Sequence, residues 1–296
     1  MDASSDRAAA ALEALIARLH GRGRLRVWSL VITLFGDAIL PRGGEAPLAL
    51  IQDVMARLGI EAGAVRTAMS RLAADHWVER ERRGRNSYFR LDARGRHAFD
   101  LATRRIYAAG PPVWDGSWTV AIATASAAAN AAAELTENGF LKLADNIFLC
   151  PRTLPEQNGL REVLSDMLVI RGSSAEHPEQ LRNLWPSQDI ANAYRDLLKS
   201  WMPYAFELEQ CSPPAALDAM AARTLLIHDW RRIVLRDPGL PAALLPRDWP
   251  GEEARAMVAG IYGKLVANSE RWLDEAGLPA QTKRAAFAAR FCDVKP

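Results

Sequence analysis

The sequence feature that most constrains this fold is a basic hairpin pattern that directly follows an amphipathic helix pattern. Residues 78–91 form two strand-like runs separated by a turn at Gly84. Four polar side chains surround that turn: Arg82, Arg83, Arg85 and Asn86. Because so much positive charge cannot be packed inside a protein, the tip is predicted to be exposed. Its charge is suited to a polyanion.

The helix pattern before the hairpin has two distinct faces. Val65, Met69 and Leu72 recur at spacings of four and three, which predicts one apolar face of a helix near residues 61–74. The opposite face carries Arg66, Thr67, Ser70 and Arg71. Arginine can bind guanine edges, and hydroxyl groups can contact phosphates or bases. An ordinary solvated helix face is the alternative, but a helix followed by a basic hairpin favours DNA contact.

Two further helices are predicted upstream of this pair. An apolar helix runs from about Leu25 to Phe35 and is expected to end at Gly36-Asp37, and the next begins at Pro47 and is capped by Gly59. Three helices and a hairpin in this order predict a winged helix-turn-helix domain over residues 25–110. Residues 1–24 are an N-terminal extension, which is either a short helix on Leu12, Leu15, Ile16 and Leu19 or a flexible segment.

Net charge supports a basic module at the start of the chain. The 296 residues carry a net charge of only +2, yet residues 1–110 hold eighteen arginines and no lysine against twelve acidic residues. The length is suited to two or three domains. Cys150, Cys211 and Cys292 form no paired motif, so neither a disulfide framework nor a metal site is predicted. With no apolar run long enough for a membrane span, a cytoplasmic location is expected.

A linker pattern at residues 109–112 introduces a second region with alternating strands and helices. The expected order is a strand at 118–122, a helix at 125–138, strands at 140–143 and 146–150, a helix at 156–165 and a strand at 167–170. This βαββαβ order predicts a ferredoxin-like middle domain over residues 111–180. A helical domain is expected over 181–296, with helices at 188–209, 214–235 and 251–276. The predicted fold class is therefore α+β.

Several segments, taken together and in order, resemble the PaaX-type repressors of phenylacetate degradation. They are residues 33–37, 41–44, 65–72, 228–232, 236–238, 244–246 and 248–251. The resemblance implies the same three-part architecture and a homodimeric repressor of a catabolic operon. It also implies release from double-stranded operator DNA by a small effector, phenylacetyl-CoA or a related CoA thioester, with no bound cofactor.

The His228-Asp229 pair raises the question of catalysis. Adjacent helical residues point about 100° apart, and no companion motif is present, so a buried structural histidine with neighbouring salt bridges is favoured over a nucleophile relay or metal site. His228, Arg231 and Arg232 are also a candidate effector site, in which the two arginines would meet the phosphates of CoA.

The predicted function is a ligand-responsive repressor and not an enzyme. A metal-dependent nuclease of ferredoxin-like shape would need an acid at the end of its first strand, but Ile122 is followed by none and Asp115 precedes the strand. The alternatives are a protein-interaction module, or a metal-dependent nuclease or hydrolase, with incidental DNA affinity.

Overall fold

The computed structural model has an α+β fold and describes residues 3–151, 158–174, 182, 188–210 and 212–292. The chain divides into two compact units. The larger unit combines residues 1–109 with 193–235 and 251–296, and the smaller unit combines 110–192 with 236–250. The three-domain division expected from the sequence stays a prediction, and its boundary at residue 180 lies outside the described residues.

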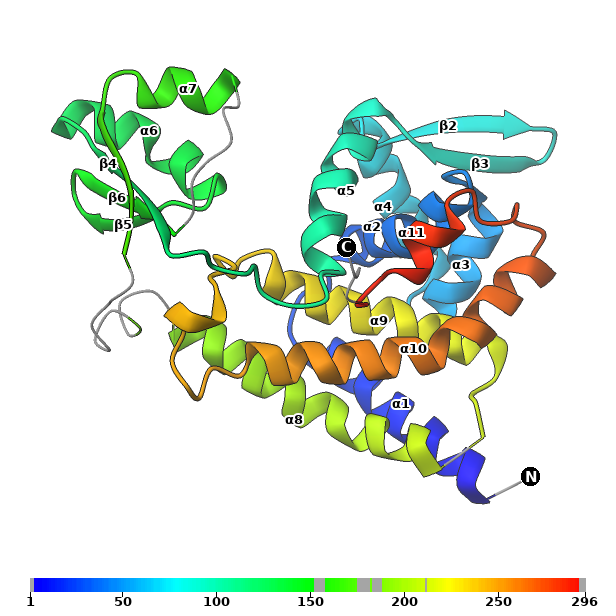
Figure 1. Cartoon of the computed structure of the whole chain (residues 1–296). Coiled ribbons are helices and arrows are strands. Elements are labelled where there is room, and N and C mark those ends of the chain that lie inside the picture. The colour runs from blue at the N-terminus through cyan, green and yellow to red at the C-terminus, as the bar shows by residue number, and fades with distance from the viewer. Residues whose placement is uncertain (1–2, 152–157, 175–181, 183–187, 211, 293–296) are drawn as a thin grey trace. The chain divides into compact units, whose positions relative to one another are not determined.

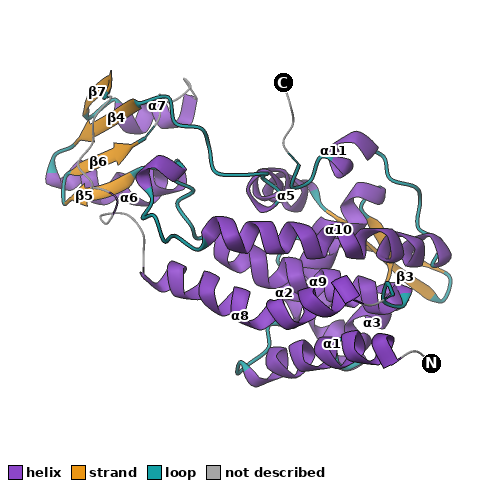
Figure 2. Cartoon of the chain, turned by 60° about the horizontal axis from the view of Figure 1, so that its bottom comes forward, coloured by secondary structure: helices purple, strands orange, loops and turns teal. Residues whose placement is uncertain are grey.

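The larger unit is mainly helical. Its helices are α1 (Ala3–Gly21), α2 (Val27–Leu34), α3 (Leu48–Arg57), α4 (Ala62–Ala74), α5 (Ala93–Ile106), most of α8 (Gln188–Gln210), α9 (Ala216–Val234), α10 (Gly251–Glu275) and α11 (Arg284–Ala288). Helices α9 and α10 run side by side (Figures 1 and 2). Every residue of α9 from Ala219 to Trp230 is buried, so α9 is the central helix of this unit. No described helix is both long and apolar enough to cross a membrane.

The N-terminal residues form a packed helix rather than a flexible segment. Leu12, Leu15, Ile16 and Leu19 of α1 are all buried, as the apolar periodicity predicts. Side chains at the end of the helix tie it to α9, because Arg18 and Arg22 both pair with the carboxylate of Asp229. Of the two alternatives for residues 1–24, the helix is the correct one.

The expected end of the second helix at Gly36-Asp37 is wrong. Helix α2 continues into a π-helical turn, Phe35–Ile39, and a 3₁₀ turn, Leu40–Arg42. Gly36 has a packing role here, since a Cβ added to it would overlap the ring of Phe99 on α5. The glycine allows two helical segments to approach closely instead of ending one of them.

Local sequence signals position the hairpin. Helix α3 starts after Pro47 and ends before Gly59, whose φ of +73° is readily adopted only by glycine. Strands β1 (Glu45–Pro47), β2 (Val78–Arg83) and β3 (Asn86–Leu91) form an antiparallel sheet in the order β1-β3-β2. Asp92 then caps α5 by accepting a hydrogen bond from the amide of Gly95 at 2.7 Å, as the sequence predicts.

The smaller unit is a four-stranded antiparallel sheet with helices on one face. Its elements are β4 (Ser117–Ile122), α6 (Ala125–Glu137), β5 (Leu141–Ala144), β6 (Ile147–Cys150), α7 (Asn158–Leu164) and β7 (Leu168–Ser173), and the strand order is β5-β6-β4-β7. Residues of α6 and α7 share a core with Ala121, Phe148 and Cys150. Leu240, Leu244 and Leu245 pack with Leu149, Trp118 and Val120, whose side chains belong to the opposite face.

Candidate nucleic-acid interface

Helix α4 presents the polar face that the sequence predicts. Its apolar positions, Val65, Ala68, Met69 and Leu72, are buried against the unit. Arg66, Thr67, Ser70 and Arg71 are all exposed. The Thr67 hydroxyl donates to the Gly63 carbonyl at 3.1 Å, and the Arg71 guanidinium lies 3.6 Å from the Asp75 carboxylate. An exposed pair of this kind is weak in water, so Arg71 can exchange its partner for a phosphate or a base.

The hairpin tip separates its arginines into two kinds. Arg83 forms two hydrogen bonds to Glu45 of β1, at 2.6 and 2.9 Å, and also pairs with Glu81. Those hydrogen bonds, to Glu81 first and Glu45 second, raise the pKa of Arg83. Its guanidinium also lies over the Tyr88 ring, 4.6 Å from the centroid. Arg83 therefore braces the hairpin against β1, and its charge is neutralised locally.

The other tip residues are exposed without such neutralisation. The Arg82 Nε donates to the carbonyl of Gly84 at 3.2 Å, and Arg85 and Asn86 are exposed beside it. Within the described part of the chain, no carboxylate lies at ion-pair distance from Arg66, Arg82 or Arg85. Guanidinium groups without a carboxylate partner are the ones best able to neutralise phosphates.

A tight turn joins α4 to the hairpin. The Trp77 amide donates to the Leu72 carbonyl at 2.9 Å, and the Asp75 amide to the Arg71 carbonyl at the same distance. Between them His76 has a left-handed φ of +55°. Two segments predicted to act together are thus joined through a short hydrogen-bonded connection rather than a loose loop.

The predicted effector residues separate in the structure. His228 is buried, 3.4 Å from the Thr33 hydroxyl, and burial lowers its pKa to about 4. Arg231 donates to the hydroxyls of Thr33 at 2.7 Å and Ser29 at 2.6 Å, and burial lowers its pKa to about 10. Arg232 is exposed. The structure therefore brings His228 and Arg231 together at Thr33 but does not place Arg232 with them.

Asp229, next to His228, has a separate set of partners. Its carboxylate accepts from Trp201 Nε1 at 3.1 Å and pairs with Arg18 and Arg22 of α1. The pair therefore joins α9 to α2 on one side and to α1 and α8 on the other. Among the described residues, no three His, Cys, Asp or Glu side chains gather as metal ligands would.

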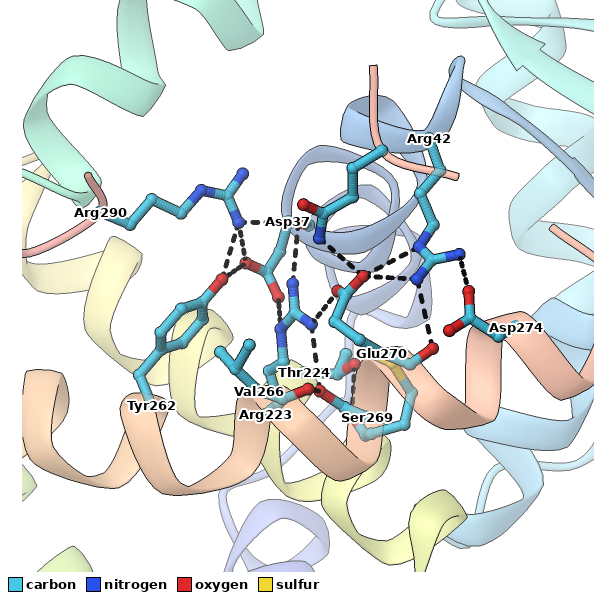
Figure 3. Close-up of polar contacts among 12 residues, drawn as sticks. Asp37, Arg42, Arg223, Thr224, Tyr262, Val266, Ser269, Glu270, Asp274 and Arg290 are labelled. Carbon is cyan, nitrogen blue, oxygen red and sulfur yellow. Dashed lines mark hydrogen bonds and ion pairs between the residues drawn. The ribbon is translucent and has the colours of Figure 1, made fainter. Parts of the chain in front are cut away.

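Sequence reasoning missed a buried charge network that holds the larger unit together. The carboxylate of Asp37, in the π-helical turn, accepts hydrogen bonds from Arg223 at 2.7 Å, Tyr107 at 2.6 Å, Tyr262 at 2.9 Å and Arg290 at 2.9 Å. Figure 3 shows the Arg223 guanidinium between Asp37 and Glu270. Burial alone would raise the pKa of Asp37, but the charges of Arg223 and Arg290 lower it.

The network continues from Glu270 to Arg42. The Arg42 guanidinium, almost fully buried, donates to Glu270 at 2.7 Å and to Asp274 at 2.7 Å (Figure 3). It thereby links the 3₁₀ turn after α2 to α10. A signal was available in the sequence, because Asp37 and Arg223 are single charges inside otherwise apolar runs, where a charge is stable only if it is paired.

Comparison with known proteins adds relatives to this geometry. The family model of PaaX-like proteins matches residues 26–95, and that of the PaaX-like protein C-terminal domain matches residues 185–275. The transcriptional repressor PaaX of Escherichia coli (strain K12) is 29% identical over 263 residues, which cover 84% of this chain and 83% of the relative.

A solved structure is similar in fold. The uncharacterized protein Rv0674 from Mycobacterium tuberculosis superposes with a TM-score of 0.52 at 20% identity, over 77% of this chain and 90% of that one. The first family model contains α4 and the hairpin, and the second contains α9 and nearly all of α10. Since both models match in the expected order and the E. coli relative aligns along most of the chain, this chain belongs to the family of PaaX-like proteins.

Proposed function

We propose that this protein is a transcriptional repressor that binds double-stranded operator DNA through α4 and the β2–β3 hairpin. The observation that carries the proposal is the set of exposed arginines without carboxylate partners, Arg66 on the helix and Arg82 and Arg85 on the hairpin. The repressor activity of the E. coli relative supports it. In this proposal α2 to α5 and the hairpin act as a winged helix-turn-helix, with α4 in the major groove and the hairpin against the DNA backbone.

The proposed repressor acts in the cytoplasm as a homodimer, with the smaller unit as a ferredoxin-like domain. The strand order β5-β6-β4-β7, with all neighbours antiparallel and the helices on one face, supports that domain type. Two copies would place two α4 helices in successive major grooves of a roughly palindromic site.

A small anionic effector, with a CoA thioester as the proposed class, releases the repressor. The supporting observation is Arg231, whose guanidinium has hydroxyl and carbonyl partners but, within the described residues, no carboxylate. Substituting Arg231 and Arg232 together with alanine should raise the phenylacetyl-CoA concentration needed for release from DNA. Unchanged release by a variant with an unchanged circular dichroism spectrum would remove these residues from the effector site.

Footprinting on the DNA upstream of its own gene tests the DNA-binding proposal. Arg71→Ala should relax protection at particular bases, because Arg71 lies on the face proposed to read the groove. Arg271→Ala is a matched control: both arginines are exposed and lie near an acid four residues later, at 3.6 Å for Asp75 and 3.7 Å for Glu275. Equal footprints for the two variants, or no defined protected site, would favour a protein-interaction module instead.

A further inference from the structure

Helix α8 carries an exposed stripe that the DNA-binding proposal does not use. Met202 and Phe206 are 56% and 60% exposed, which is unusual for large apolar side chains one helical turn apart. Exposed charged residues extend the stripe at spacings of four and three. Its members are Arg195, Lys199, Met202, Phe206 and Glu209. At 100° per residue they lie within about 80° of one another, the width of a coiled-coil seam.

The opposite face of α8 fixes the direction of this stripe. Tyr194, Trp201 and Tyr204 are each at most 1% exposed, and Trp201 Nε1 donates to the buried carboxylate of Asp229 at 3.1 Å. The Trp201 and Tyr204 rings also meet edge to face. Because this face is locked into the larger unit, α8 cannot rotate to bury Met202 and Phe206 within its own chain.

The stripe is complementary to itself when reversed. Met202 precedes Tyr204 by two positions and Phe206 follows it by two, while Lys199 precedes it by five and Glu209 follows it by five. A second α8, placed antiparallel about a twofold axis at the level of Tyr204, would set Met202 opposite Phe206 and Lys199 opposite Glu209. Each contact would occur twice, as twofold symmetry requires.

We propose that α8 is a surface through which two copies of this chain associate as antiparallel helices. Methionine against an aromatic ring is a favourable contact, and the opposite charges at the two ends select the antiparallel direction over the parallel one. Lys264 of α10 already lies 3.3 Å from Glu209, so the partner's Lys199 would meet a carboxylate that is held in place. The inference rests on the dimer of the proposed function for its biological setting.

The size of the seam indicates how strong the association is. Two heptads of helix span about 21 Å, which is short compared with the interfaces of permanent dimers. The free protein should therefore be in a monomer–dimer equilibrium at micromolar concentrations. Binding to two adjacent half-sites would strengthen the pairing, because DNA holds both copies at a high effective concentration.

Sedimentation equilibrium of the full chain tests the apolar centre of the seam. The double variant Met202→Glu/Phe206→Glu should weaken dimerisation at least tenfold, since it places four carboxylates together. Leu168→Glu/Ile170→Glu is the control, because these two side chains of β7 are 62% and 50% exposed and belong to the smaller unit. A dimer that survives the α8 change but is lost with the β7 change would overturn the inference.

A charge exchange tests the antiparallel direction. Lys199→Glu and Glu209→Lys should each weaken the dimer, and the two together should restore it, because opposite charges again face each other. Lys264→Ala, which removes the neighbour of Glu209 within the chain, should leave the dimer unaffected. Failure of the double exchange to restore the dimer would rule out this pairing.

Operator binding separates this inference from the proposed function. A Met202→Glu/Phe206→Glu chain that is monomeric should still contact one half-site, with apparent affinity for the full operator reduced at least tenfold. If the wild-type protein dimerises through α8 but protects no DNA, the repressor proposal fails and the interface stands. If the variant remains dimeric and binds the operator fully, the interface fails and the repressor stands.

Discussion

At the residue scale, Asp37 is a carboxylate that depends entirely on other side chains. It is 1% exposed and accepts hydrogen bonds from two guanidinium and two phenol groups. Asp37→Asn keeps the volume but removes the charge, which leaves Arg290 buried without a counter-ion. We expect the free energy of unfolding to fall by about 3–5 kcal/mol in urea denaturation at pH 7. Asp75→Asn, on the surface, is the control; equal losses would mean that the network contributes nothing special.

His228 makes stability depend on pH in a defined direction. Its pKa is about 4 in the folded protein, whereas an unfolded histidine has a pKa of 6.5. Between these values the unfolded chain binds a proton that the folded chain does not, so acidification favours unfolding. The contribution of His228 is complete above pH 6.5 and decreases as the pH falls towards 4.

The expected loss from this one group is on the order of 3 kcal/mol. His228→Gln should remove that part of the slope in urea denaturation series at pH 7, 5.5 and 4.5. His76→Gln, at an exposed position, should leave the slope unchanged. An identical pH dependence for wild type and His228→Gln would contradict a neutral buried imidazole.

At the scale of elements, two glycines in helical segments should respond in opposite ways to alanine. In the π-helical turn, a Cβ on Gly36 would overlap the Phe99 ring, so Gly36→Ala should destabilise the protein by about 1–3 kcal/mol. In α10, Gly260 is exposed with nothing within 4 Å of an added Cβ. Gly260→Ala should therefore stabilise by roughly 0.5–1 kcal/mol. Thermal unfolding of both variants checks the signs, and the same sign for both would refute the packing argument.

Most elements could be predicted because their signals are local. Apolar spacing predicts a helix near 61–74, and α4 spans Ala62–Ala74; the strand-like runs of 78–91 became β2 and β3 around Gly84. The end of α2 was mispredicted because glycine has two uses, to end a helix or to let a neighbour approach. Only the position of Phe99, 63 residues further along, distinguishes the two.

Partners of charged groups could not be predicted in the same way. Arg82, Arg83 and Arg85 look equivalent in sequence, but Glu45 of a strand 38 residues away neutralises Arg83. Asp37 and Arg223 are 186 positions apart, so no window of helical or strand periodicity contains both. The sequence indicates that each charge needs a partner, whereas the fold determines which one it has.

At the scale of the whole molecule, the affinity for DNA should depend on salt through the exposed arginines. Arg85→Ala should weaken binding evenly across sequences and reduce the slope of log affinity against log salt by about one. Arg83→Ala should change that slope less, because its guanidinium is already paired with Glu45 and Glu81. Fluorescence anisotropy from 50 to 300 mM salt measures both, and the prediction is wrong if Arg83→Ala flattens the slope more than Arg85→Ala.

The buried network has a consequence for how the protein is made. Asp37 leaves the ribosome early, but Arg223, Tyr262 and Arg290 are synthesised up to 253 positions later. Until they emerge, a nascent chain exposes an uncompensated acid in the segment that must support α4 and the hairpin. Messages cut short before codon 290 would therefore yield products that chaperones retain and proteases remove, so fragments could not compete with the finished protein for its target.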